Sequence, residues 1–463
     1  MLVRFFLVSL FSLSWGGLKA QESTKPLIAP IAGGLQFKFN ESGSQYLKMN
    51  IVTQTWFRGI ENNPGTAVNG DPQPWTLDAG LRRMRIQIYG EMSPRFLLML
   101  QMGTNNQSFA SGGSVSASDS AGAGKRPPFF FHDAYGQFNV IPEKDPAGKK
   151  DKFFSLAVGT GLHSWNGVSR LTNASCITLL TADSPIFNWP TVEVSDQFTR
   201  QFGLFAKGHI YKIAYRVSIN KPFMTSFLPK TGGPAVDNNR GNQVSYNGYF
   251  SWQFKDREQT TTAFYAGSYY GKKKILNVGV GFMHNPRGTM TQPVKGQFES
   301  HNLTTLGLDV FYDMPIGNPS KEMVFTFYSV WYRYNFGPDY LRTTGVMNPG
   351  TKDPSFTGIR ALEGFGNRKI LMGTGQIWYA HTAFMLPKFS DKIRLQPYVA
   401  YSYKELQALN QSGRYYNLGA NFLFDGNRAK VSLEYGSRPL YGVADRKVFT
   451  RRGEVLACIQ FWL

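Results

Sequence analysis

Most of the chain after residue 45 is divided into segments of about ten residues in which apolar and polar side chains alternate. A period of two residues is typical of β-strands, because successive side chains of a strand point to opposite faces. Helical periodicity is nowhere sustained. The pattern is clearest in segments 210–220, 245–255, 392–404 and 428–438. The chain is therefore predicted to be all-β.

The apolar face of these segments is rich in aromatic side chains, which make up 15% of the chain. A soluble antiparallel sandwich would also alternate, with one face in the core and one in water. Here the aromatic residues gather near the segment ends, as they do in the girdles of membrane barrels. This distribution favours a transmembrane antiparallel β-barrel with long extracellular loops and short periplasmic turns.

Seventeen segments have the strand pattern, but single-chain bacterial barrels close with an even number of strands. Short and long connections should also alternate between the two sides of the membrane. When connections are assigned to the two sides from the N-terminus and from the C-terminus, the two assignments disagree within residues 256–273. Removing segment 259–270 from the wall makes the assignments agree and the strand number even. The sequence thus predicts about 16 strands, with Asp256 to Lys273 as a periplasmic or lumen-folded excursion.

The first residues indicate export. Met1–Arg4 is short and cationic, Phe5–Leu13 is almost wholly apolar, and small residues follow. This order is typical of a secretory signal peptide, and the apolar stretch is too short to span a bilayer. We expect a signal peptide over 1–20, a periplasmic lead-in over 21–45 and the barrel over 46–463. The predicted location is the outer membrane of a Gram-negative bacterium, with its lipid as a partner.

The formal charge of +20 calls for an anionic partner. Export argues against nucleic acid, so small anions are the expected solutes. In the strand around Arg83 and Arg85, both side chains share one face, whereas Arg82 lies on the other. Charge on the lipid face costs about 2–4 kcal/mol at the membrane midplane. Arg83 and Arg85 should therefore face the lumen, and Arg82 should lie at the water interface.

The same reasoning extends the predicted anion pathway to other basic residues on polar strand faces. Asp309, Glu434 and loop acids are available to pair with some of them. The complete set is Arg83, Arg85, Lys212, Arg216, Arg333, Lys392, Arg394, Lys430 and Arg438.

The long segment 162–197 is rich in Trp, Pro, Asn and Asp, which suits an ordered loop. We expect it to fold into the lumen and form a constriction that includes Trp165, Arg170 and Trp189.

Motifs for catalysis or metal binding are weak. His163 and Ser164 are neighbours, so on a strand they point to opposite faces, and there is no phosphate-binding glycine loop, CxxC pair or HExxH. We predict no catalytic residue, no enzyme activity, no metal and no cofactor.

Several short segments occur in a recognisable order. They are Leu81-Arg-Arg-Met-Arg-Ile-Gln-Ile-Tyr-Gly90, Val158-Gly-Thr-Gly-Leu-His-Ser-Trp-Asn-Gly-Val-Ser-Arg170, Gln201-Phe-Gly203, Tyr416-Asn-Leu-Gly-Ala-Asn421 and Lys430-Val-Ser-Leu-Glu-Tyr435. In this order they resemble the phosphate-selective porin family, in the form common in Bacteroidetes. The resemblance implies a sixteen-strand barrel, usually trimeric, that passes anions. The arginine ladder and lysine cluster of selective members find no match, so phosphate selectivity is not implied.

Three functions fit a barrel of this kind. The first is a porin-like channel passing small solutes, with preference for anions through a basic lumen. The second is a closed β-barrel acting as an adhesin or as a component of an outer-membrane secretion or assembly complex. The third, a barrel enzyme, would need a nucleophile and base at one rim, and the sequence offers no such pair.

Overall fold

The structure is a computed structural model that describes residues 35–41, 43–93, 95–109, 129–144, 151–185, 187, 200–388, 390 and 392–463. The predicted signal peptide over 1–20 lies outside the described residues, as do most of the lead-in and Trp189. No helix in these ranges is long and apolar enough to cross a membrane.

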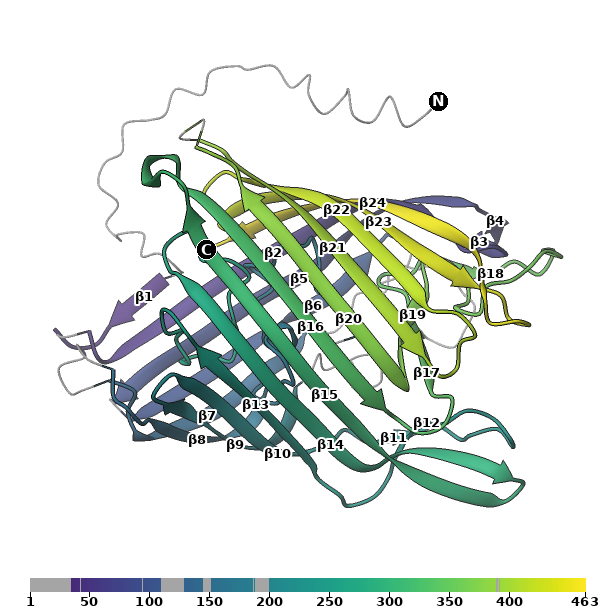
Figure 1. The fold of residues 1–463 in the computed structure, drawn as a ribbon, viewed down its shortest axis with the longest axis horizontal. Helices are drawn as coiled ribbons and strands as arrows, with labels where there is room; N and C mark the ends of the chain where they lie inside the picture. Colours follow the sequence, from purple (N-terminus) through teal and green to yellow (C-terminus); the bar gives the residue numbers. More distant parts are fainter. Residues whose placement is uncertain are drawn as a thin grey trace.

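Sixteen antiparallel strands form a closed barrel, in which β24 pairs with β2 (Figure 1). The strand number and fold class predicted from the sequence are confirmed. The wall strands are β2 (Tyr46–Glu61), β5 (Trp75–Ser93), β6 (Phe96–Ser108), β7 (Phe130–Ile141), β8 (Leu156–His163), β9 (Gln201–Ile210), β10 (Ile213–Lys221), β13 (Ser245–Gln253), β14 (Ile275–Val294), β15 (Gln297–Ile316), β16 (Met323–Asn335), β20 (Gly375–Met385), β21 (Arg394–Leu406), β22 (Gly413–Leu423), β23 (Ala429–Tyr441) and β24 (Val448–Trp462).

Shorter elements lie at the two rims of the barrel. β1 (Leu35–Lys38) extends the wall beside β2, and β11 (Thr225–Ser226) and β12 (Val236–Asn239) extend it beside β14. The remaining elements belong to connections: β3 (Thr66–Val68), β4 (Asp71–Pro72), β17 (Leu341–Thr344), β18 (Thr351–Lys352), β19 (Lys369–Gly373), and the short helices η1 (Leu171–Asn173) and η3 (Pro319–Lys321).

The two rims differ in the length of their connections. β2 begins and β24 ends at one rim, where most links are short, such as 211–212 and 424–428. The opposite rim carries long links, including 164–200 and 336–374. Outer-membrane barrels have short periplasmic turns and longer extracellular loops. We therefore call the first rim periplasmic and the second external.

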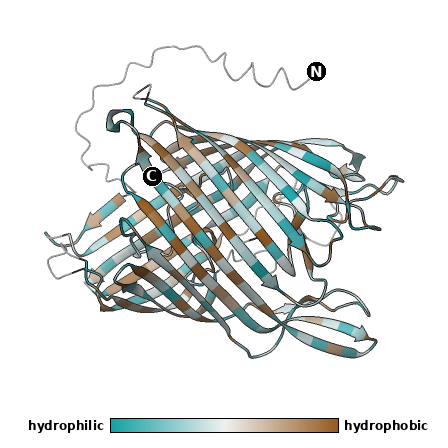
Figure 2. Cartoon of the chain, in the orientation of Figure 1, coloured by the Kyte–Doolittle hydropathy of each residue, from teal (hydrophilic) through white to brown (hydrophobic). Residues whose placement is uncertain are grey.

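Hydrophilic and hydrophobic residues alternate along many of the wall strands, as the colours in Figure 2 show, and their side chains are in turn buried in the lumen and exposed on the outer face. On β14, for example, Val278, Val280 and Phe282 are exposed outward, whereas Asn277 is buried inside. Exposed large apolar residues recur around the whole wall. Lipid replaces water as the solvent of this face, because its band of apolar side chains matches the hydrocarbon region.

A β-bulge interrupts the alternation on β5. Gln54 pairs with Arg83 and Thr55 pairs with Leu81, so Arg82 is an extra residue in β5. Bulges of this kind redirect side chains. Arg82 is consequently buried in the lumen beside Arg83, and the expectation that it lies at the water interface is wrong.

Two connections fill much of the lumen. Residues 164–185 enter from the external rim and are mostly buried. Residues 254–274 enter from the periplasmic rim, contain no strand and meet the first segment, with Ala174 bridged to Tyr265. We call these the external plug segment and the periplasmic plug segment. The second is the excursion predicted from the parity of the strands.

Glycines on the inner wall allow the external plug segment to approach closely. A Cβ atom at Gly281 would lie 2.3 Å from the carbonyl oxygen of Val168, and one at the paired Gly307 would lie 2.6 Å from it. Any larger residue would displace the segment from β14 and β15.

The outward position of Val280 gives a test of the fold. Because its side chain is exposed in the middle of the lipid-facing part of β14, Val280→Arg should lower the free energy of unfolding in lipid vesicles by about 2–4 kcal/mol. Val280→Leu is the matched control and should change little. Equal unfolding free energies for the two variants would contradict the assigned outer face.

Candidate functional site

Charged side chains of the wall hold the backbone of the external plug segment. The Lys430 ammonium donates to the carbonyl oxygen of Leu179 at 3.0 Å. The wall carboxylates take the opposite partners: Glu434 accepts from the Ala182 N–H at 3.1 Å, and Asp309 accepts from the Arg170 N–H at 2.7 Å. Buried charges of both signs are thus satisfied by peptide groups.

Asp183 at the tip of this segment binds the two arginines of the bulge. Its carboxylate lies 2.9 Å from Arg82 and 2.5 Å from Arg83. Burial alone raises the pKa of Asp183, but the two guanidinium groups lower it to about 2. The carboxylate is therefore ionised at neutral pH, and it neutralises one of the two arginines.

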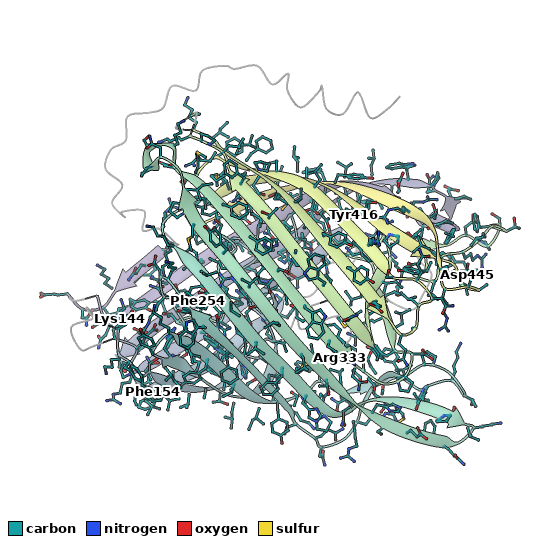
Figure 3. All side chains as sticks on the ribbon, viewed as in Figure 1. Lys144, Phe154, Phe254, Arg333, Tyr416 and Asp445 are labelled. Carbon is teal, nitrogen blue, oxygen red and sulfur yellow. The ribbon has the colours of Figure 1, made fainter. Side chains whose placement is uncertain are left out.

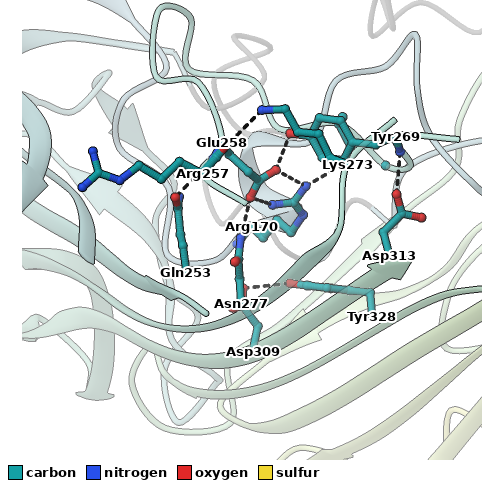
Figure 4. Close-up of polar contacts among 12 residues, drawn as sticks. Arg170, Gln253, Arg257, Glu258, Tyr269, Lys273, Asn277, Asp309, Asp313 and Tyr328 are labelled. Atoms are coloured by element: carbon teal, nitrogen blue, oxygen red, sulfur yellow. Dashed lines mark hydrogen bonds and ion pairs between the residues drawn. The ribbon is translucent and has the colours of Figure 1, made fainter. Parts of the chain in front are cut away.

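Arg170 and Glu258 join the two plug segments (Figure 4). The two terminal guanidinium nitrogens of Arg170, Nη1 and Nη2, donate to the Glu258 carboxylate, and Nη2 also donates to the carbonyl oxygen of Ala266 at 2.6 Å. Tyr269 and Asn277 donate to the same carboxylate. Burial would lower the pKa of Arg170, but Glu258 raises it, so the guanidinium stays charged. This buried pair is the polar centre of the plug.

Trp165 lies in the lumen between two wall cations. Its ring stacks on Phe205, with Lys207 at 4.4 Å and Arg216 at 4.9 Å from the ring centre. Arg216 also donates to the carbonyl oxygen of Ala263 in the periplasmic plug segment at 2.9 Å. The predicted pathway residue Arg216 is thus inside the barrel, but it holds a plug segment.

Three predicted pathway residues lie at the periplasmic rim and do not line the lumen. Lys212 is in the turn between β9 and β10, where its ammonium donates to the carbonyl oxygen of Phe254 at 3.1 Å. Lys392 is exposed in the turn before β21, and Arg394 binds Glu322 of the neighbouring turn. These three residues have the inward parity that the alternation predicts. They lie at or just before the periplasmic ends of their strands, so they do not lie along the lumen.

Arg333 is on the outer face, so the expectation that it faces the lumen is wrong. On β16 the inward residues are Tyr328, Tyr332 and Tyr334, which leaves Trp331 and Arg333 outward. Arg333 lies near the external end of the strand (Figure 3). A long basic side chain is tolerated there because its charged end can reach water.

Arg438 and other basic residues line the external half of the lumen. Arg438 donates to the carbonyl oxygen of Glu61 at 2.5 Å. Lys404, which the predicted anion pathway does not include, also faces the lumen. Its ammonium donates to the carbonyl oxygens of Ile370 and Leu371 at 2.7 and 2.9 Å. A role for Arg58 was not predicted from the sequence. Its guanidinium pairs with Asp78 and donates to the carbonyl oxygens of Val346 and Met347 in the external loop 336–374.

Two cavities adjoin the plug in the part of the lumen that the described residues line. An external cavity of about 150 Å³ lies beside the external loop 336–374, and its lining includes Phe187, Lys404 and Tyr415. A second cavity of about 250 Å³ lies between the external plug segment and β2, β5 and β6, and we call it the basic cavity. Ser184 lines both, so the cavities adjoin at the tip held by Asp183.

Arg83, Arg85 and Arg200 line the basic cavity, and no Asp or Glu is among the described residues lining it. Arg83 is paired with Asp183, and Arg200 with Asp133 at 2.9 Å. Arg85 donates only to the carbonyl oxygens of Met84 and Thr104 and to the Asn105 side chain. The charge of Arg85 therefore has no carboxylate to offset it in the part of the chain that the structure describes.

The wall and lumen define the class of the molecule. An even-stranded closed barrel with an apolar outer face and a polar interior is a transmembrane β-barrel of the outer-membrane type. This architecture belongs to the outer membrane of Gram-negative bacteria.

Among solved structures, several outer-membrane proteins are similar to the chain at low sequence identity. The chain is similar to the outer membrane channel DcaP of Acinetobacter baumannii, with 10% identity, a TM-score of 0.48, and 93% of this chain and 100% of that chain covered. It is similar to OprB of Pseudomonas putida, with 9% identity, a TM-score of 0.49, and coverages of 89% and 94%. It is also similar to OmpT of Vibrio cholerae in its trimer form, with 10% identity, a TM-score of 0.44, and 91% of this chain and 100% of that chain covered.

No protein-family model matches the chain, and no curated protein matches it. The function proposed below therefore rests on the residues of the lumen.

The buried pair between the plug segments gives the first test of the site. Glu258→Gln leaves the Arg170 charge buried without a carboxylate partner, which should weaken the local packing by about 3–5 kcal/mol. Hydrogen exchange should accelerate in residues 164–185 and 254–274 and stay unchanged in the wall strands. The double variant Arg170→Met, Glu258→Met should recover part of the protection. Unaltered exchange in Glu258→Gln would contradict the role of this pair.

Glu363 in the external loop gives a pH-dependent test. Burial raises its pKa to about 7, although hydrogen bonds from the backbone, including the Tyr441 N–H, and the Arg438 charge lower it. Because the carboxyl pKa is raised in the folded loop, the protonated Glu363 stabilises the loop. This contribution is fully present below about pH 4.5 and is lost as the pH rises through about 7. Exchange of residues 361–368, corrected for the intrinsic rate, should increase over that range. Glu363→Gln should abolish the increase, and a wild-type loop that does not respond would contradict the assignment.

Proposed function

We propose that this protein is an outer-membrane channel that passes small solutes and prefers anions. The observation that carries the proposal is the basic cavity, which three arginines line and no described carboxylate enters. A permeating anion would face the unpaired charge of Arg85 there, with the guanidinium groups of Arg83 and Arg200 nearby. Fixed positive charge between low-dielectric walls concentrates anions locally.

The route would run from the external mouth through the external cavity, past Asp183 and Ser184, and into the basic cavity. The external plug segment, with Trp165 and Arg170 at its base, would form the constriction. Most other basic residues of the lumen, among them Lys430 and Arg438, would act by holding the plug and would contribute only a background field. Conduction needs attraction weak enough for the anion to leave. The pairing of Arg83 and Arg200 with carboxylates keeps the attraction modest.

The order of the motifs resembles that of the phosphate-selective porin family, and this resemblance implies a trimer. We therefore expect a homotrimer of channels with anion preference, without assigning phosphate as the solute. Neither an enzyme activity nor a cofactor is part of the proposal.

A closed barrel serving a surface or secretion complex is the second candidate. The observation favouring it is the extent of the plug. It contacts β15 through Asp309 and β16 through Tyr328. It contacts β23 through Lys430 and Glu434. The two candidates differ in whether purified protein carries current in a bilayer.

Single-channel recordings in a KCl gradient test the proposal. The wild-type reversal potential should indicate anion preference that weakens as salt is raised, because mobile ions screen the fixed charges. Arg85→Gln should lower the chloride-to-potassium permeability ratio by about a factor of 2 or more. Arg333→Gln removes an equal charge from the outer face, so it is the matched control and should leave the ratio unchanged.

Cation preference in the wild type, or equal effects of Arg85→Gln and Arg333→Gln, would contradict the proposal. Folded protein that carries no current would favour the closed barrel.

A further inference from the structure

The outer wall carries an apolar depression between β16 and β23. Its volume is about 480 Å³. Small outward side chains on β20 create it, because larger residues on the neighbouring strands stand higher on each side. Its outward-facing lining includes Ala380, Thr382, Val399, Tyr401, Tyr416 and Leu418.

A row of aromatic rings crosses the external end of this depression. Trp378 contacts Tyr401, with ring centres 5.5 Å apart, and Tyr401 contacts Tyr416 at 5.4 Å. Tyr416 is labelled on β22 in Figure 3. Trp and Tyr gather where the hydrocarbon of a bilayer meets the lipid head groups. The row therefore marks the level of the head groups on the external side.

Two arginines lie on the water side of this row. Arg451 of β24 stands 5.2 Å from the Tyr416 ring centre and is held by the Ser437 hydroxyl at 3.1 Å and the Arg414 carbonyl oxygen at 3.0 Å. Arg414 of β22 is two residues beyond Tyr416 on the same outward face, and it is exposed. Neither guanidinium forms an ion pair with any described carboxylate, and the nearby Glu405 is bonded to Gln376.

We propose that this face binds one outer-leaflet lipid with a phosphate in its head group. The phosphate binds Arg414 and Arg451, and one acyl chain occupies the depression. A guanidinium offers a planar fork of donors that matches a phosphate, and Arg451 is already oriented by two bonds to the backbone and one to a side chain. The arginines and the depression meet at Tyr416, so one molecule can contact both.

The lipid explains both halves of the site. A free anion would use the arginines and leave the depression in contact with bulk lipid, whereas a zwitterionic lipid would use the depression and gain less from two unpaired cations. Lipid binding at this site on the outer wall is independent of what the lumen conducts.

The test is titration of the detergent-solubilised barrel with bis-phosphorylated lipid A, followed by native mass spectrometry. The double variant Arg414→Gln, Arg451→Gln should weaken lipid A binding at least tenfold. Ala380→Phe, which fills the depression, should weaken it without changing the charge. Lys221→Gln is the matched control, since Lys221 is an exposed cation near the external rim on β10, away from the depression. It should bind as the wild type does.

Two competitors separate the sources of phosphate. Phosphatidylcholine should bind weakly and equally to the wild type and the double arginine variant, and inorganic phosphate at millimolar concentration should not displace lipid A. Equal lipid A affinity in the double arginine variant and the wild type would overturn the proposal. Displacement by inorganic phosphate would do so as well. Loss of oligomers in Ala380→Phe, measured by mass photometry, would instead identify the depression as an interface between copies of the chain.

Discussion

The interior of this barrel is governed by the need to satisfy buried charges. The lumen walls carry cations and carboxylates at positions that bulk water does not reach freely, and an unpaired buried charge is costly. The plug segments supply the partners: Leu179 offers a carbonyl oxygen to Lys430, Ala182 offers an N–H to Glu434, and Asp183 offers its carboxylate to Arg82 and Arg83. The wall and the plug therefore need each other.

This mutual dependence sets what remains for a solute. A basic sequence does not by itself make a basic pore, because most lumen cations are committed to the plug. Among the described residues that line the basic cavity, the cation without a carboxylate partner is Arg85, and the segment that Asp183 holds bounds this cavity. Selectivity and access are thereby linked through the same few contacts. On the outer wall, Arg414 and Arg451 form no ion pair with a described carboxylate, and there the membrane itself supplies anions.

Alternation along the strands, combined with the even strand number of closed barrels, predicted the closed wall, its strand number and the inward faces of Arg83, Arg85 and Lys430. It could not predict the bulge that turns Arg82 inward, because one extra residue reverses the faces without changing the composition. The outward face of Arg333 was misjudged for a related reason, since three inward tyrosines make the polar and apolar faces of β16 hard to distinguish.

Contacts between the plug segments are remote in sequence, as between Arg170 and Glu258, and no local pattern encodes them. Asp183 is where these constraints converge, so the conductance of Asp183→Asn is the most direct measurement. Without the carboxylate, the tip of the external plug segment loses its hold and two arginines lose their counter-charge. Single-channel recordings should show a larger conductance and a reversal potential shifted further toward that of chloride. A conductance and reversal potential equal to those of the wild type would contradict a plug held in the lumen by this carboxylate.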